Sequence, residues 1–172
     1  MYVGKILSII AGILTLIATF IFSWIAIDSG GVIYYANGFG IIKNLPNMFT
    51  DAENLEAILD IPAFAFYIIA GVFILFLAAG VLQILGAYHR VPIIIGTLVV
   101  LCITTLLFLG SLDVINREDW IVNILGTDEL LVEDIIPYQL LDVNNLDLGV
   151  FLLYAGGIVG LIAAIYGPSE FF

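Results

Sequence analysis

The feature of this chain that most restricts its fold is the run 61–88, in which no side chain is charged. At 1.5 Å per residue a helix of this run is roughly 42 Å long, whereas the hydrocarbon core of a bilayer is about 30 Å thick. Three more apolar runs follow the same pattern: about 3–27, where Lys5 is the only charge, 91–112 and 148–166. Because backbone groups in lipid must be hydrogen-bonded within their own segment, each run predicts a helix.

The amino-acid composition also predicts that the chain lies in a lipid bilayer. Hydrophobic residues make up 63% of the 172 residues and charged residues only 11%, against about 45–50% and about 25% in soluble domains. A soluble domain of this length has too small a core to bury so much apolar surface. We therefore predict an all-α membrane protein. It is a single domain (1–172), an antiparallel bundle of four transmembrane helices with ordered outer loops at 28–60 and 113–147.

The distribution of charge predicts the orientation. Of the 15 acidic residues, all but Glu170 lie in the two long loops. The opposite side carries two of the four Lys and Arg residues, Lys5 and Arg90, in very short segments, with His89 beside Arg90. Lys and Arg in short loops favour the cytoplasmic side. We expect a multi-pass cell-membrane protein with cytoplasmic N- and C-termini, in which Lys5 and Arg90 anchor the topology.

The first outer loop has signals of ordered structure. The segments 32–35 and 39–42 are β-branched or aromatic, and the turn residues between them predict a β-hairpin. Thr50 with Glu53 three residues later forms a capping-box pattern, which predicts a short helix beginning there.

The second outer loop mixes acids with large apolar residues. Thr127 as an N-cap and Pro137 as a stop predict a short helix between them. The apolar side chains can pack on the protein's own bundle, lie in the membrane interface or contact a partner. The candidate partner surface consists of Trp120, Ile121, Ile124, Leu130 and Leu131.

Small residues recur every four positions on two of the predicted helices. Such stripes let helix backbones approach closely in lipid, so we expect them to face other helices, and each other as one option. Gln83 is the most polar residue within a run; a hydrogen bond to a neighbouring helix or to interfacial water explains it, and a functional role is the alternative. The stripe residues are Ala11, Thr15, Thr19, Ser23, Gly156, Gly160 and Ala164.

The sequence lacks the residues that several classes of activity require. No Asp, Glu, Arg or His lies at mid-depth of a run, where ion pumps and charged-substrate transporters place one. The single cysteine, Cys102, forms no intrachain disulfide, and Glu129 with Glu133 lacks any recognised calcium-loop pattern. We therefore predict no catalytic residue, metal or cofactor. The acidic loops argue against nucleic acid.

The layout has a short inner N-terminus, four helices, a strand-bearing first outer loop, a tight inner turn and a second outer loop. It resembles claudin/PMP22-like tetraspan membrane proteins, although residues 28–60 contain neither the tryptophan nor the paired cysteines of that signature. The cysteine signature of tetraspanins is also missing. The opening "GKILSIIAGILTLIATFIFSW" looks like uncharacterised small prokaryotic four-helix membrane proteins. The resemblance implies contacts between proteins or cells rather than catalysis.

These observations favour a non-enzymatic membrane protein that contacts partners through its acidic outer loops. It is expected to be an accessory subunit of a membrane complex or a self-associating component of the cell envelope. One alternative is a channel or carrier for small solutes or cations, with the acids as an electrostatic funnel. Another is a membrane enzyme acting on lipid or quinone through outer carboxylates such as Glu118 and Asp119.

Overall fold

The computed structural model describes residues 3–111, 117–128 and 146–167, and most of them are helical. The helices are α1 (Val3–Phe20), α2 (Gly38–Thr50), α3 (Ala52–Leu59), α4 (Ala63–Leu77), α5 (Ala79–Leu85), α6 (Arg90–Ser111), α7 (Arg117–Trp120), the π-helical turn η1 (Ile121–Leu125) and α8 (Leu148–Tyr166). The strands are β1 (Ile25–Ser29), β2 (Val32–Ala36) and β3 (Gly126–Thr127).

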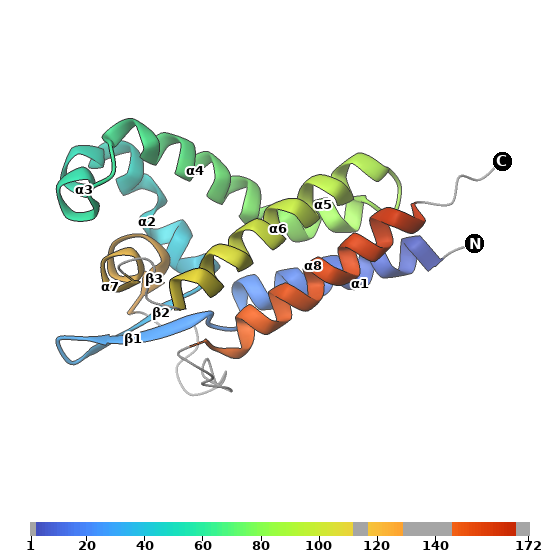
Figure 1. Ribbon diagram of the computed structural model, residues 1–172, viewed down its shortest axis with the longest axis horizontal. Coiled ribbons are helices and arrows are strands. Elements are labelled where there is room, and N and C mark those ends of the chain that lie inside the picture. The colour runs from blue at the N-terminus through green and yellow to red at the C-terminus, as the bar shows by residue number, and fades with distance from the viewer. Residues whose placement is uncertain (1–2, 112–116, 129–145, 168–172) are drawn as a thin grey trace.

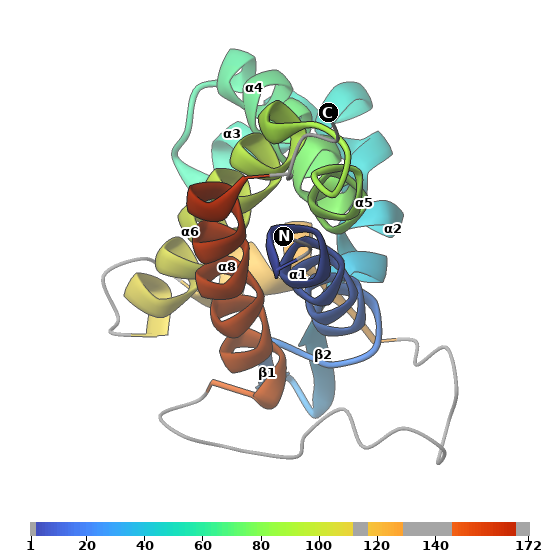
Figure 2. The same ribbon diagram turned by 90° about the vertical axis from the view of Figure 1, so that its right-hand side faces the viewer.

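Four helices pack around one another as a bundle. Helix α1 contacts α5 and α8, and α6 contacts the same two helices from the other side, as Figures 1 and 2 show. The strands, α2, α3, α7 and η1 gather at one end, which we call the sheet end, and both termini lie at the other, the terminal end. Helices α1 and α8, and α6 over 90–109, are each long and apolar enough to cross a membrane.

The predicted helix over 61–88 is not one straight element. It is divided at Ala78 into α4 and α5. Helix α5 lies in the bundle, whereas α4 leaves it and packs on α2, α3 and α6 (Figure 1). Helix α4 is shorter than a span. With α3 it forms a pair that is long and apolar enough but bent by 100°, so the described residues contain three candidate spans, or four with that pair.

The buried side chains differ in size on the two sides of Ala78. The buried face of α4 carries three phenylalanines, among them Phe76, whose ring lies 5.4 Å from that of Trp24 in an edge-on contact. The buried residues of α5 are Ala79, Gly80 and Gln83. The large rings of α4 pack in the core cluster that extends into the sheet end, whereas Gly80 lets α5 approach α1 closely.

The helix in the first apolar run, 3–27, is also shorter than predicted. Helix α1 ends at Phe20, and residues 25–27 belong to β1. The indole Nε1 of Trp24 turns back and donates to the carbonyl oxygen of Ala18 at 2.8 Å, which gives a partner to one of the carbonyls that a helix end leaves unpaired. The backbone nitrogen of Trp24 donates to Ala36 O at 2.8 Å and starts the sheet.

The sheet is antiparallel, in the order β1–β2–β3. Ile25 pairs with Ala36, and the hairpin turns at Gly30 and Gly31, which have φ of 65° and 86°. Such positive values favour glycine. A hairpin is therefore present, but the prediction that 32–35 pairs with 39–42 is wrong, because 39–42 lies in α2.

A helix cap causes this difference. Asn37 has an extended backbone, and its Oδ1 accepts a hydrogen bond from Gly40 N at 2.9 Å, so "NGFG" begins a helix instead of turning a hairpin. The predicted cap at Thr50 is also wrong. Thr50 ends α2 and donates to Pro46 O, and α3 begins after Asp51, which makes no side-chain cap.

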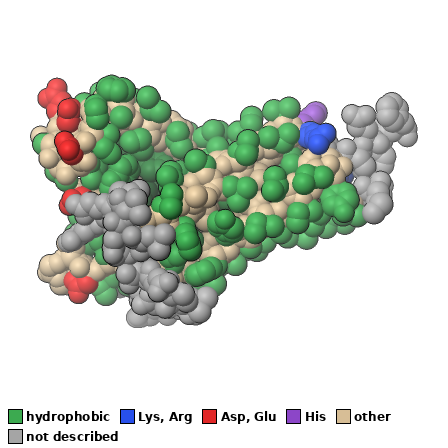
Figure 3. Space-filling view, in the orientation of Figure 1, with side chains coloured by type: hydrophobic (Ala, Val, Ile, Leu, Met, Phe, Trp, Pro, Cys, Tyr) green, Lys and Arg blue, Asp and Glu red, His purple; other side chains and the backbone are tan. Residues whose placement is uncertain are grey.

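Helix α1 buries its small residues and exposes its large apolar residues. Every buried residue of α1 is glycine, alanine, serine or threonine, while Ile6, Ile9, Ile10 and Ile13 are exposed. Figure 3 shows hydrophobic side chains over the visible face of the bundle. The largest buried side chains, such as Trp24 and Phe66, lie in a cluster that extends into the sheet end.

Candidate functional site

Four buried polar side chains meet between α1, α5 and α6, and we call them the polar seam: Ser8, Thr15, Gln83 and Thr97. Thr15 Oγ1 donates to Gln83 Oε1 at 2.6 Å, and Gln83 Nε2 donates to Thr97 Oγ1 at 3.3 Å. Ser8 Oγ donates to the backbone oxygen of Gln83. All four side chains are at most 1% exposed, so Gln83 is paired within the protein rather than with interfacial water.

Glycines of α8 cover the polar seam. A Cβ on Gly160 would lie 2.4 Å from Thr97 Oγ1 and 2.8 Å from Gln83 Nε2, and one on Gly156 would lie 2.7 Å from Thr15 Oγ1. Side-chain atoms essentially never approach so closely, so only glycine leaves room for these polar groups. The seam is therefore filled by hydrogen-bonded protein atoms.

The two predicted stripes of small residues lie inside the bundle. Gly156 sits against Thr15 and Ala11 of α1, whereas Gly160 sits against α5 and α6. Ala164, further along α8, packs with Ile93 at the terminal end. The stripes of α1 and α8 thus meet at Gly156, and the two helices are still in contact at the terminal end, where a Cβ on Gly4 would lie 2.1 Å from Gly167 O.

A second buried polar group lies where α1 ends and α8 begins; Ser23, Trp24 and Asp147 form it, and we call it the outer junction. Ser23 Oγ donates to Asp147 Oδ2. Asp147 N donates to Trp24 O at 2.9 Å, and Gly149 N donates to Ser23 O at 3.0 Å. With its link to Ala36, Trp24 ties α1, the sheet and α8 together.

Asp147 is the functional suspect that the sequence analysis missed. It was counted among the acids of the outer loops, yet only 1% of it is exposed. Its position directly before the apolar run of α8 is a signal, because a carboxylate at a helix N-terminus is stabilised by the helix dipole. Its burial depends on Ser23, 124 residues away in the chain, which no local pattern reveals.

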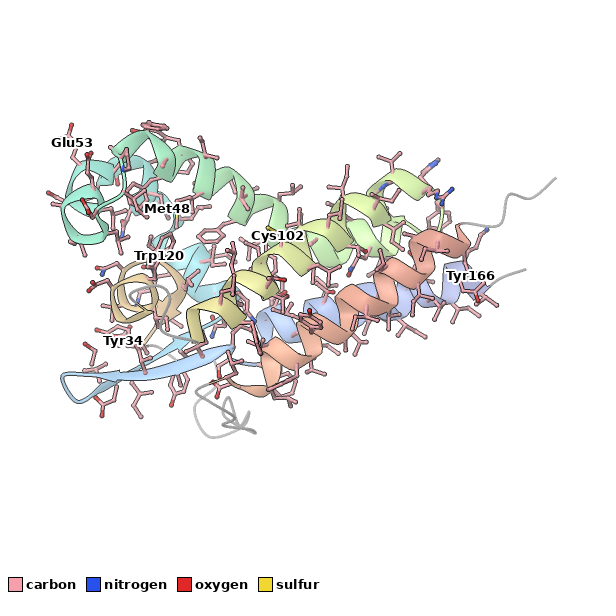
Figure 4. The ribbon with its side chains drawn as sticks, in the orientation of Figure 1. Tyr34, Met48, Glu53, Cys102, Trp120 and Tyr166 are labelled. Carbon is pink, nitrogen blue, oxygen red and sulfur yellow. The ribbon has the colours of Figure 1, made fainter. Side chains whose placement is uncertain are left out.

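The two predicted topology anchors lie at the terminal end. Arg90 starts α6, and its Nε donates to Ala164 O of α8 at 3.1 Å, whereas Lys5 is half-buried on α1. Arginine and histidine side chains lie at this end in Figure 3, and Asp and Glu side chains at the other. Figure 4 places Tyr166 at the terminal end and Glu53 at the sheet end.

The candidate partner surface faces inward where the structure describes it. Ile121 and Ile124 are at most 1% exposed, and Trp120 is half-buried against the core cluster. Met48, Trp120 and Tyr34 come from α2, α7 and β2 and belong to this packing (Figure 4). The expectation that Ile121 and Ile124 contact a partner is wrong, because they are buried. Leu130, Leu131 and the predicted helix up to Pro137 lie outside the described residues.

Acidic groups of the sheet end are spread over its surface. Asp28, Asp51, Glu53, Glu56 and Asp60 are exposed. Lys43 Nζ lies 2.9 Å from Asp128 Oδ1 in an exposed ion pair. Among the residues that the structure describes, no three His, Cys, Asp or Glu side chains are grouped so that they can hold a metal. Glu129, Glu133 and the side chain of Glu118 fall outside that part; Asp119 is half-buried.

An apolar groove of about 430 Å³ lies between α6 and α8. Its volume is within the range of small-molecule sites, about 300–1,000 Å³. Its wall is apolar except for the hydroxyls of Thr105 and Tyr154, and Thr105 already donates to Leu101 O. The lining residues are Thr105, Phe108, Val150, Phe151, Tyr154, Ala155 and Ile158.

Comparison with known proteins gives no relative. The chain matches no protein-family model, no curated protein and no solved structure. The residues and geometry described above are therefore the basis for any functional conclusion.

Proposed function

We propose that the chain is a membrane protein of four spans, α1, α4 with α5, α6 and α8, arranged antiparallel. The support is the distribution of side chains on α1, where small and polar residues are buried and isoleucines are exposed. In lipid the helices gain nothing by hiding leucine from a solvent that is itself apolar, so small residues and hydrogen bonds drive their packing. The polar seam and the glycines of α8 supply both.

In this proposal the sheet end faces outward and both termini are cytoplasmic. The exposed carboxylates of the sheet end and the basic residues Lys5 and Arg90 at the opposite end support this orientation.

The proposed function is non-enzymatic: the sheet end contacts another protein, and the chain is an accessory subunit or a self-associating envelope component. The observation that carries this proposal is that the sheet end is a folded unit. A continuous core joins Ile41 of α2, Ile124 of η1 and Trp24 to the bundle. A chain that needed only short connections between helices gains nothing from such a unit, whereas a folded surface binds a partner at a lower cost in conformational entropy.

Site-specific photo-cross-linking in native membranes tests this proposal. A cross-linking residue replaces Glu53, which is exposed on α3, or, as the matched control, Leu98, which is 59% exposed on α6 in the bundle. We expect a protein adduct from position 53 and lipid adducts from position 98. A strictly monomeric chain in mild detergent, with no protein adduct from position 53, contradicts the proposal.

A channel or carrier is the second candidate, and one observation favours it. Polar residues occupy the buried face of α1 from Ser8 to Thr19 and continue to Ser23. The hydrogen bonds within the polar seam close this row to solutes in the described structure. Flux into proteoliposomes above that of empty vesicles, reduced by Gln83→Leu, supports this candidate; equal flux in both preparations contradicts it.

A further inference from the structure

Thr19, in the last turn of α1, carries a buried hydroxyl that the packing of the bundle leaves unpaired. The residue is 1% exposed, and within the described part of the chain its Oγ1 has no hydrogen-bond partner. A hydroxyl taken out of water without a replacement partner is unfavourable, so each such group calls for an explanation.

Two other threonines of the bundle donate to a backbone carbonyl of their own helix, and Thr19 does not. Thr104 Oγ1 donates to Val100 O and Thr105 Oγ1 donates to Leu101 O, each at 2.7 Å and each to the carbonyl four residues earlier. This bond is the usual one for threonine within a helix. Thr19 does not form it, and the atom of its side chain nearest to the chain at Gly38 is the methyl Cγ2.

The position of Thr19 is between the two buried polar groups. Thr15 of the polar seam lies four residues before it, and Ser23 of the outer junction lies four residues after it. Ser23 lies beyond the end of α1 at Phe20, whereas Thr15 and Thr19 both lie in the helix, where four residues rise by about 6 Å. That separation is about twice the usual O–H···O distance of ~2.8 Å, so one water molecule can bridge two such hydroxyls.

We propose that Thr19 Oγ1 holds a buried water molecule, and that this water bridges Thr19 to Thr15 Oγ1 of the polar seam. Gln83, Thr15, the water and Thr19 then form one hydrogen-bonded row. A buried water stabilises a protein by satisfying groups that otherwise lack partners. The ligand is water itself. The proposal does not rest on a partner protein, and it is independent of the cross-linking result.

Removing the hydroxyl while keeping the side-chain shape tests the proposal. In detergent micelles, Thr19→Val lowers the midpoint of thermal unfolding and Thr19→Ser retains it, because serine keeps the hydroxyl. Thr104→Val is the matched control, since Thr104 is equally buried but bonds its own helix; its midpoint changes less. If the unfolding midpoint of Thr19→Val is equal to or above that of the unchanged protein, the hydroxyl of Thr19 has no hydrogen-bond partner. That result overturns the proposal.

An experimental structure at a resolution that shows ordered water gives a direct test that does not require any variant to fold. We expect water density within hydrogen-bond distance of Thr19 Oγ1 in the unchanged protein. If the hydroxyl instead donates to Thr15 O and no such density is present, the proposal is overturned.

Discussion

At the scale of single residues, the bundle depends on a few polar atoms whose partners lie far away in the sequence. Gln83 contacts Thr15 and Ser8 on α1 and Thr97 on α6 through its amide and backbone oxygen. In the buried interior of the bundle an unpaired amide has no alternative partner, so the arrangement that satisfies Gln83 specifies how three helices fit together.

Gln83→Leu is expected to destabilise the fold by about 1–2 kcal/mol, because Thr15 Oγ1 loses its acceptor while remaining buried. Adding Thr15→Val to the same chain removes the hydroxyl that has lost its acceptor. This second change is expected to recover part of the lost free energy of unfolding. A double-mutant cycle measured by unfolding in mixed micelles then gives a coupling of about 0.6–1.7 kcal/mol. Additive effects of the two changes are evidence against the hydrogen bond between Thr15 and Gln83.

At the scale of elements, close approach between helices is decided by glycine. A Cβ on Gly12 of α1 would lie 2.5 Å from the backbone oxygen of Gly80 in α5. Backbone atoms cannot turn aside as a flexible side chain can, so the two helices must separate to admit even a methyl group. Gly71 of α4, by contrast, has nothing within 4 Å of the position that a Cβ would occupy.

Gly12→Ala is therefore expected to cost about 1–3 kcal/mol through overpacking. Gly71→Ala is the matched control, and it is expected to stabilise α4 by roughly 0.5–1 kcal/mol because alanine loses less backbone entropy in a helix. Thermal unfolding of the two variants in the same detergent compares them. Equal midpoints for both variants are incompatible with the contact between α1 and α5.

At the scale of the whole molecule, the two ends differ in charge and in structure. The sheet end carries exposed carboxylates, and the terminal end carries Lys5, His89 and Arg90. If the bundle spans a membrane as proposed, this asymmetry also decides its orientation, since basic residues in short segments are retained on the cytoplasmic side.

Thiol labelling of intact cells measures that orientation. With Cys102 replaced by alanine, a cysteine at Asp51 is expected to react with a membrane-impermeant reagent, and one at His89 only after permeabilisation; both positions are exposed. Arg90→Glu removes an inner positive charge and is expected to give a mixture of the two orientations or poorer insertion. Labelling at position 89 without permeabilisation reverses the assignment.

The sequence by itself determined the regular helices. The run 148–166 is α8 with the same bounds, and the run 91–112 is α6 to within one residue at either end. Local physics suffices here, because a long apolar segment satisfies its backbone only as a helix. Gln83 and the small-residue stripes also stood out from the sequence, since polar and small residues are conspicuous among leucines and isoleucines.

Only the tertiary structure decided where these helices stop and which polar groups become buried. Trp24 ends α1 through Ala18 and Ala36, and Phe76 against Trp24 accompanies the departure of α4 from the bundle. Asp147 is buried because Ser23, far away in the chain, meets it. Each outcome depends on contacts between distant segments, and periodicity and composition describe only neighbours along the chain. The apolar runs determined where the helices form, and packing between the helices determined which polar groups are buried.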